Sequence, residues 1–180
     1  MRAFLAHVRK ELRDQRGILL GVLLMNLHYH FRGPAERYIL DKHPWPGLLD
    51  GTVEFHMTGK PLSGNLALGK IAWLRACEPE VFERTRWYLD VVGFLVGRLT
   101  GAPCTGWGNA DPLGLFALQR GCWAEELLSY LGIRAEQLPE AFPPGNTMGR
   151  VSEEAAQACG LPVGLPVIAG VGDGQAGGAG

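Results

Sequence analysis

The chain has 180 residues, of which 47% are hydrophobic and 19% are charged, and its formal net charge at pH 7 is −1. This length allows one domain with its own core, and this composition excludes an intrinsically disordered chain. A net charge so close to zero gives no electrostatic reason to expect nucleic acid or a membrane surface as a partner.

The N-terminal region predicts a helix followed by a strand. Apolar residues recur at helical spacing over residues 3–15, and the longest apolar run follows at residues 18–25. This run is far shorter than the about 20 residues that a membrane-spanning helix requires, so we interpret it as a buried strand. Beyond it, His28, His30 and His43 have no nearby cysteine or carboxylate to complete a metal site, and we expect loop histidines.

The cysteines argue for a reducing compartment. Cys77, Cys104, Cys122 and Cys159 are far apart and form no CxxC pair, which disfavours a structural zinc site. We interpret them as small core residues of a cytoplasmic protein.

Helix signals become clear in the middle of the chain. Ser63 and Asn65 are candidate caps for a helix that continues to Cys77, and Pro79 favours the start of a short second helix. Residues 87–89, with two aromatic side chains and a leucine, predict a strand.

A second group of helices follows this predicted strand. Asp90 is a candidate cap for a helix that runs through Leu99 and ends before Gly101. Residues 104–121 are rich in glycine and polar groups and predict an ordered loop or hairpin, and residues 124–131 predict a further helix.

The C-terminal segment has a carboxylate at the end of a strand. A helix capped by Ser152 is predicted to end at Gly160, and residues 166–168 predict a buried strand. The glycine-rich segment 170–174 comes next and contains Asp173, a residue placed to act as a general base. The chain stops soon afterwards in glycine, and we expect it to be truncated.

Several segments taken together resemble one protein family. They occur in order at residues 58–63 (TGKPLS), 66–74, 78–82 (EPEVF), 96–101 (VGRLTG), 109–111 with 115–116, 123–128, 138–140, 149–151, 160–167 and 169–175 (AGVGDGQ). This succession resembles the FGGY family of carbohydrate kinases, and within it the xylulokinase-like members.

The resemblance implies an α/β protein with a partial actin/hexokinase-like (ribonuclease H-like) domain, in which helices flank a mixed sheet. Residues 1–180 would form a partial N-terminal, sugar-binding domain that lacks its N-terminal phosphate hairpin, and the C-terminal nucleotide domain would be absent. The implied reaction is transfer of the γ-phosphoryl group of MgATP to a hydroxyl of a ketose such as xylulose. Sugar and ATP are the implied partners, and the isolated chain is expected to be inactive.

The resemblance also implies roles for single residues. By its place in the matching motif, Asp173 is assigned as the catalytic base. Gly172, Gln175, Asn109 and Asp111 lie in matching segments and are candidate substrate-binding residues. No metal-binding residue is assigned.

Alternatives to these roles remain open. Asp173 could cap the helix expected to begin at Gly174, and the polar candidates could make ordinary loop hydrogen bonds. Trp107, which lies between glycines, is the tryptophan that we consider for ligand contact, whereas Trp73 and Trp123 lie in amphipathic patterns typical of core residues.

Two other functions also stay open. The chain could be a non-catalytic sugar-binding remnant, or a small oxidoreductase, because residues 172–177 fit the dinucleotide pattern GxGxxG. That pattern requires an acidic residue about 20 positions later, and this chain ends before that position. The identity of the sugar and the oligomeric state, with a homodimer among the options, are left open.

Overall fold

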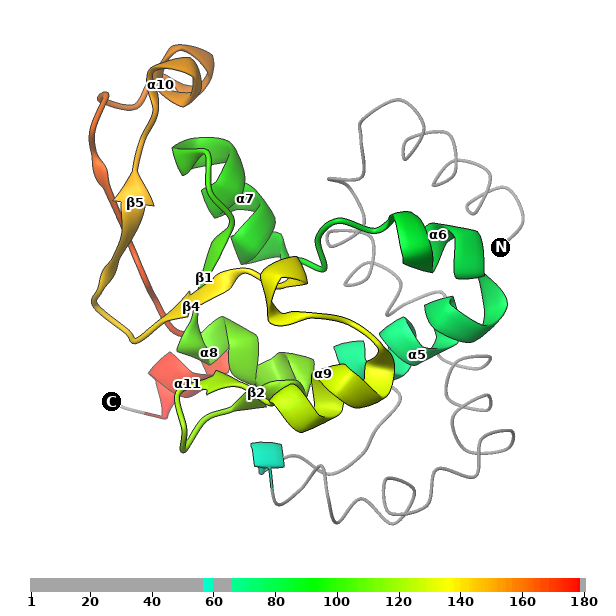
Figure 1. The fold of residues 1–180 in the computed structure, drawn as a ribbon. Coiled ribbons are helices and arrows are strands. Elements are labelled where there is room, and N and C mark those ends of the chain that lie inside the picture. Colours follow the sequence, from blue (N-terminus) through cyan, green and yellow to red (C-terminus); the bar gives the residue numbers. More distant parts are fainter. Residues whose placement is uncertain (1–56, 60–65, 179–180) are drawn as a thin grey trace.

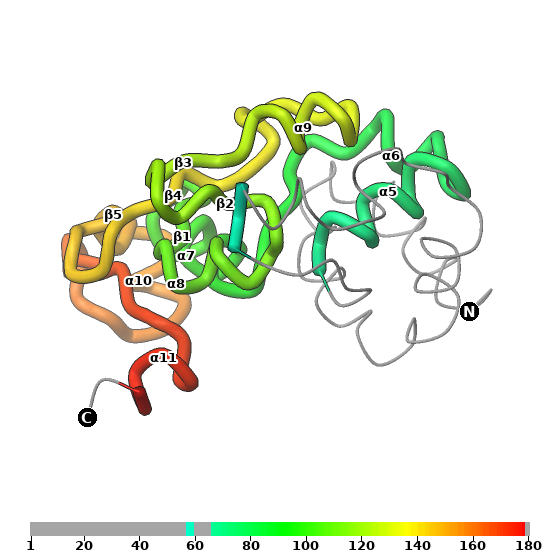
Figure 2. Tube along the Cα trace, turned by 90° about the horizontal axis from the view of Figure 1, so that it is seen from below, coloured from blue at the N-terminus to red at the C-terminus, as the bar shows by residue number. Residues whose placement is uncertain are grey.

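The computed structural model describes residues 57–59 and 66–178. The predicted helix at 3–15, the strand at 18–25, the loop histidines and the candidate caps Ser63 and Asn65 lie outside these residues. The described part consists of short helices around three two-stranded β-ladders (Figure 1). Figure 2 shows that these elements extend from α5 and α6 at one end to β5, α10 and α11 at the other.

The first two described helices confirm the sequence prediction. Helix α5 spans Ala67–Cys77 and buries a face that includes Leu68 and Ile71. Helix α6 spans Pro79–Arg84 and has its proline at the start, where the missing N–H costs nothing.

Helix α7 (Val91–Thr100) begins at a buried carboxylate. Asp90 is 3% exposed, and its Oδ1 accepts a hydrogen bond from the Gly93 N–H at 2.6 Å, as the sequence predicts for a cap. Its Oδ2 accepts a hydrogen bond from the Thr105 hydroxyl at 3.1 Å, which ties the helix to the next strand. At the other end, Gly101 adopts the predicted left-handed conformation with φ 87°.

The prediction of a strand at residues 87–89 is wrong. The segment forms no ladder, although the Tyr88 N–H donates to the Gln137 carbonyl at 2.7 Å. Tyr88 and Leu89 are buried, so their apolar character reflects packing rather than strand pairing. The chain turns immediately into the cap at Asp90, which leaves no length for a ladder.

Residues 104–121 contain more structure than the predicted loop or hairpin. They form β1 (Cys104–Gly106), α8 (Trp107–Ala110), the 3₁₀ helix η1 (Asp111–Leu113) and β2 (Phe116–Ala117). The hairpin is confirmed for the last part, because β2 pairs antiparallel with β3 (Cys122–Trp123).

Strand β1 has a distant partner. It pairs in parallel with β4 (Glu140–Phe142), which comes after α9 (Glu125–Leu131) and the 3₁₀ helix η2 (Ala135–Gln137). Both parallel and antiparallel pairing therefore occur, as expected of a mixed sheet, but the described residues distribute them over separate ladders.

An aromatic group lies in the larger core cluster. Phe116 is fully buried and meets the Trp123 ring edge-on at a centroid distance of 5.3 Å. Trp107 lies 5.9 Å from the same phenyl ring on the α8 side. These contacts join α8 to the β2–β3 hairpin, and α5 and α9 contribute leucines to the same cluster.

The C-terminal part forms a hairpin with helices beside it. It contains β5 (Thr147–Arg150), α10 (Glu153–Cys159), β6 (Pro166–Ile168) and α11 (Asp173–Gly177). The Ser152 hydroxyl caps α10 by accepting from the Ala155 N–H at 3.2 Å, as predicted. The predicted strand at 166–168 is present, but it is not buried, since Ile168 is 48% exposed. Within the described part of the chain, β6 pairs with β5 alone.

The cysteine prediction holds for one residue of four. Cys104 is buried in a small cluster, whereas Cys77, Cys122 and Cys159 are exposed, and none of these four described residues forms a disulfide. The described residues contain no group of three or more side chains suited to hold a metal ion. Among these same residues, no helix is long and apolar enough to cross a membrane.

We expect Asp90→Ala to lower the free energy of unfolding by about 2–3 kcal/mol, because Gly93 and Thr105 would lose their shared acceptor. Asp90→Asn keeps an oxygen acceptor and should cost less than about 1 kcal/mol. Urea denaturation of the three proteins measures both differences.

The same carboxylate should affect the pH dependence of stability. Burial raises the pKa of Asp90, so the folded protein keeps its proton at pH values where the unfolded chain has lost it. The stabilisation from this group is therefore complete below the ordinary pKa of aspartate and is lost as the pH rises through the raised value. As the pH rises from the ordinary to the raised pKa of Asp90, the free energy of unfolding of the wild type should fall relative to that of Asp90→Asn. Identical pH profiles for the two proteins would contradict a raised pKa for Asp90.

Candidate active site

The predicted catalytic carboxylate lies where β6 leads into α11. Ala169 is buried directly after the strand, and a glycine-rich turn then leads to Asp173, which is the first residue of α11. The helix thus begins one residue earlier than predicted. Figure 1 shows α11 next to α8, although the two helices are far apart in the sequence.

Two glycines allow β1 and α8 to approach this turn closely. A Cβ atom on Gly106 would lie 2.8 Å from the Gly170 carbonyl oxygen. A Cβ atom on Gly108 would lie 3.0 Å from the Val171 Cα and 3.3 Å from the Gly172 nitrogen. A Cβ atom does not fit at the Gly106 distance, and at the Gly108 distances it would be tighter than most real Cβ contacts, so the absence of both side chains allows α8 to pack against the turn.

Asp173 is exposed and has a simple local environment. Its Oδ1 accepts a hydrogen bond from the Gly174 N–H at 2.8 Å, and within the described part of the chain its Oδ2 has no partner and the group forms no ion pair. The residue in the helix-cap position is Gly172, and its N–H is bound by the Gln175 side chain at 2.9 Å. The cap position of α11 is therefore occupied by Gly172 and not, as one alternative had it, by Asp173.

The other candidate residues divide into two groups. Gly172 and Gln175 belong to the α11 turn, and the half-buried Asn109 lies on α8, with its Oδ1 3.5 Å from a Cβ position on Gly106. Asp111 is only 6% exposed, which favours the structural role that the sequence left open for it. The structure thus places Gly172 and Gln175 in the same turn as Asp173, and α8, which carries Asn109, packs against that turn through Gly108.

Trp107 has a structural role in this structure. Its indole N–H donates to the Ala141 carbonyl at 3.3 Å, which fastens α8 to β4. Its ring also lies against Gly121, where a Cβ atom would come within 2.7 Å of the ring. Trp73 and Trp123 contribute to the core cluster, as predicted.

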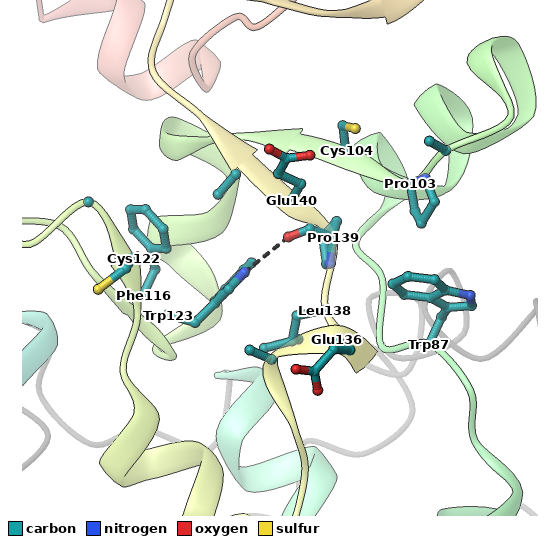
Figure 3. A pocket seen from close by; sticks show the side chains of 14 residues that line it. Trp87, Pro103, Cys104, Phe116, Cys122, Trp123, Glu136, Leu138, Pro139 and Glu140 are labelled. Carbon is teal, nitrogen blue, oxygen red and sulfur yellow. Dashed lines mark hydrogen bonds between the residues drawn. The ribbon is translucent and has the colours of Figure 1, made fainter.

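A separate cavity of about 540 Å³ opens beside the β1–β4 ladder. Trp87, Trp123 and Glu140 are among the residues that line it, and the predicted catalytic and substrate-binding residues are not (Figure 3). The sequence did not predict this cavity, because its walls come from segments that are far apart in the chain and meet only in the fold.

Comparison with known proteins shows consistent matches. A sequence model described as the N-terminal domain of the FGGY family of carbohydrate kinases matches residues 45–180. A curated protein named autoinducer-2 kinase, from Photorhabdus laumondii, is 31% identical over 133 residues, which cover 72% of this chain and 25% of that protein.

Solved structures agree with these sequence matches. A xylulose kinase from Rhodospirillum rubrum is similar with a TM-score of 0.66 and 29% identity, over 72% of this chain and 26% of that one. A gluconate kinase from Lactobacillus acidophilus has a TM-score of 0.65 and 27% identity, over 69% of this chain and 25% of that one. The chain therefore spans about a quarter of the length of the relatives that it matches.

We expect Gly108→Ala to destabilise the protein by about 1–3 kcal/mol, because the new methyl group would displace the Gln175 side-chain oxygen and crowd the backbone of the turn before Asp173. The amide NMR signals of Gly172 and Gln175 should move as the turn shifts. Gly174→Ala is the matched control, since nothing lies within 4 Å of its Cβ position, and it should be neutral or slightly stabilising. Equal effects of the two substitutions on stability and on these signals would contradict the close approach.

Proposed function

The chain belongs to the FGGY family of carbohydrate kinases, and we propose that it is part of an ATP-dependent kinase that transfers the γ-phosphoryl group to a hydroxyl of a ketose such as xylulose. The observation that carries this proposal is an exposed carboxylate at the end of β6, in register with the family motif AGVGDGQ. The match to a xylulose kinase supports the sugar class. Four cysteines without a disulfide among them support a reducing compartment such as the cytoplasm.

The fold agrees with this assignment. The chain has part of an actin/hexokinase-like α/β fold, shared with kinases of the same family. Membership of a kinase family also removes the oxidoreductase that residues 172–177 could have indicated.

Asp173 is suited to activate the sugar. A hydroxyl is a poor nucleophile at neutral pH, so a carboxylate within hydrogen-bond reach must take its proton as phosphoryl transfer proceeds. The Gly174 N–H holds Oδ1 in place. Oδ2, which has no partner among the described residues, is the atom that we assign to accept the proton.

We propose that polar groups on α8 and α11 form one side of a sugar site together with Asp173. Asn109 on α8 can donate and accept hydrogen bonds, and the Gln175 amide NH₂ is available because only its oxygen binds Gly172. We propose that these two side chains hold sugar hydroxyls while Asp173 faces the reacting one.

We propose that MgATP binds largely outside the described residues. In kinases of this kind MgATP supplies the γ-phosphoryl group, and the metal is held largely by phosphate oxygens. Because the chain spans about a quarter of the length of the relatives that it matches, we expect no turnover from this chain alone.

In a complete kinase that contains this sequence, Asp173→Asn should lower kcat by about 10²–10⁴-fold, the usual contribution of a general base. Because the amide keeps the shape of the carboxylate, the Kd for the ketose should change by less than about threefold. A coupled ADP-release assay and calorimetry measure the two quantities. Glu153→Gln, an exposed carboxylate on α10, is the control, and unchanged turnover in Asp173→Asn would refute the assigned role.

Calorimetry can separate an active kinase domain from a non-catalytic sugar-binding remnant. We expect the complete protein to bind D-xylulose and to bind it differently when a non-hydrolysable MgATP analogue is present, because both substrates meet at the same phosphoryl group. Sugar binding without any nucleotide effect would favour the remnant, and absence of sugar binding would refute both.

A further inference from the structure

We propose that the cavity beside the β1–β4 ladder is a binding site for a small organic cation with a flat aromatic body. The site is separate from the sugar-kinase site, since Asp173, Gln175 and Asn109 do not line it. Its volume of about 540 Å³ falls within the range typical of small-molecule sites.

The walls of the cavity are largely aromatic and apolar. Trp87, Phe116 and Trp123 supply rings, and Pro103 and Pro139 supply flat aliphatic surfaces. The Trp123 N–H donates to the Pro139 carbonyl at 3.0 Å, so its polar atom is already satisfied and its ring is held in place (Figure 3). Such walls favour a ligand that buries a flat apolar face.

The charged residues of the lining are both acidic. They are Glu136 and Glu140, and the lining includes no lysine or arginine. Glu136 has a weak partner, since its Oε2 lies 3.8 Å from Arg134 Nε and both side chains are mostly in solvent. Glu140 forms no ion pair with any described residue, so its charge is available to a ligand.

This charge distribution decides the class of ligand. Two carboxylates beside apolar walls disfavour nucleotides, sugar phosphates and other anions. A cationic group gains from Glu140, and a nearby indole face adds a cation–π attraction. An alkylammonium group attached to an aromatic ring through a short aliphatic chain matches both the apolar walls and the negative charge.

Cys104 contributes to the wall without reacting. Burial raises the pKa of its thiol, and the nearby Glu140 carboxylate raises it further. The sulfur therefore stays protonated and acts as a soft apolar surface, so binding is reversible and involves no covalent bond.

Three probes that share one phenyl ring test the proposal: phenethylamine (a cation), 2-phenylethanol (neutral) and 3-phenylpropanoate (an anion). They are titrated into the full chain with tryptophan fluorescence and saturation-transfer NMR as readouts. We expect phenethylamine to bind at least about tenfold more tightly than 3-phenylpropanoate, with the alcohol in between. Equal affinities, a preference for the anion or no binding of phenethylamine would overturn the proposal.

Variants locate the site. Glu140→Gln, at an exposed position, should reduce the affinity for phenethylamine to that for 2-phenylethanol and leave the alcohol unaffected. Glu125→Gln, an exposed carboxylate on α9 outside the cavity, should change neither. Trp87→Leu should weaken binding of all three probes. If Glu140→Gln still bound phenethylamine as much more tightly than 2-phenylethanol as the wild type does, the proposal would be overturned.

Discussion

The close approach of α8 to the turn after β6 is the constraint on which the candidate active site depends. Gly106 and Gly108 leave no side chain between two backbones that are about 60 residues apart in sequence. Because of this contact, the helix that carries Asn109 packs against the turn that carries Asp173 and Gln175. We expect a methyl group at Gly108 to disturb this packing, because its Cβ position is crowded by the turn and by the Gln175 side chain.

Buried hydrogen bonds of Asp90 support the strand that leads to this contact. Asp90 caps α7 and also accepts the Thr105 hydroxyl, and Thr105 directly precedes Gly106. A buried carboxylate is costly unless it is hydrogen-bonded, so the two bonds fix the helix and the strand relative to each other. On the far side, the Trp107 indole fastens α8 to β4. The segments that carry Gly106 and Gly108 are therefore hydrogen-bonded to α7 on one side and to β4 on the other.

Local sequence chemistry predicted the helices well and the strands poorly. Pro79, Asp90, Ser152 and the left-handed glycines act within a few residues of themselves, so their roles could be read directly. The strands β4 and β5 were not predicted, and residues 87–89 were misassigned, because pairing depends on partners far away in the sequence. The exposure of β6 could not be anticipated for the same reason, since its β-branched residues are equally typical of a buried strand. The family could be recognised because many short motifs occur in order, whereas the cavity beside β1 and β4 forms only where segments distant in the sequence meet.

The central claim is that Oδ2 of Asp173 receives the proton of the reacting hydroxyl. The most direct test is a crystal structure of the complete kinase with its ketose and a non-hydrolysable nucleotide analogue. We predict a distance of about 2.6–3.2 Å between that oxygen and the hydroxyl in line with the γ-phosphate. A sugar bound with that hydroxyl against another carboxylate, and with Asp173 left in solvent, would contradict it.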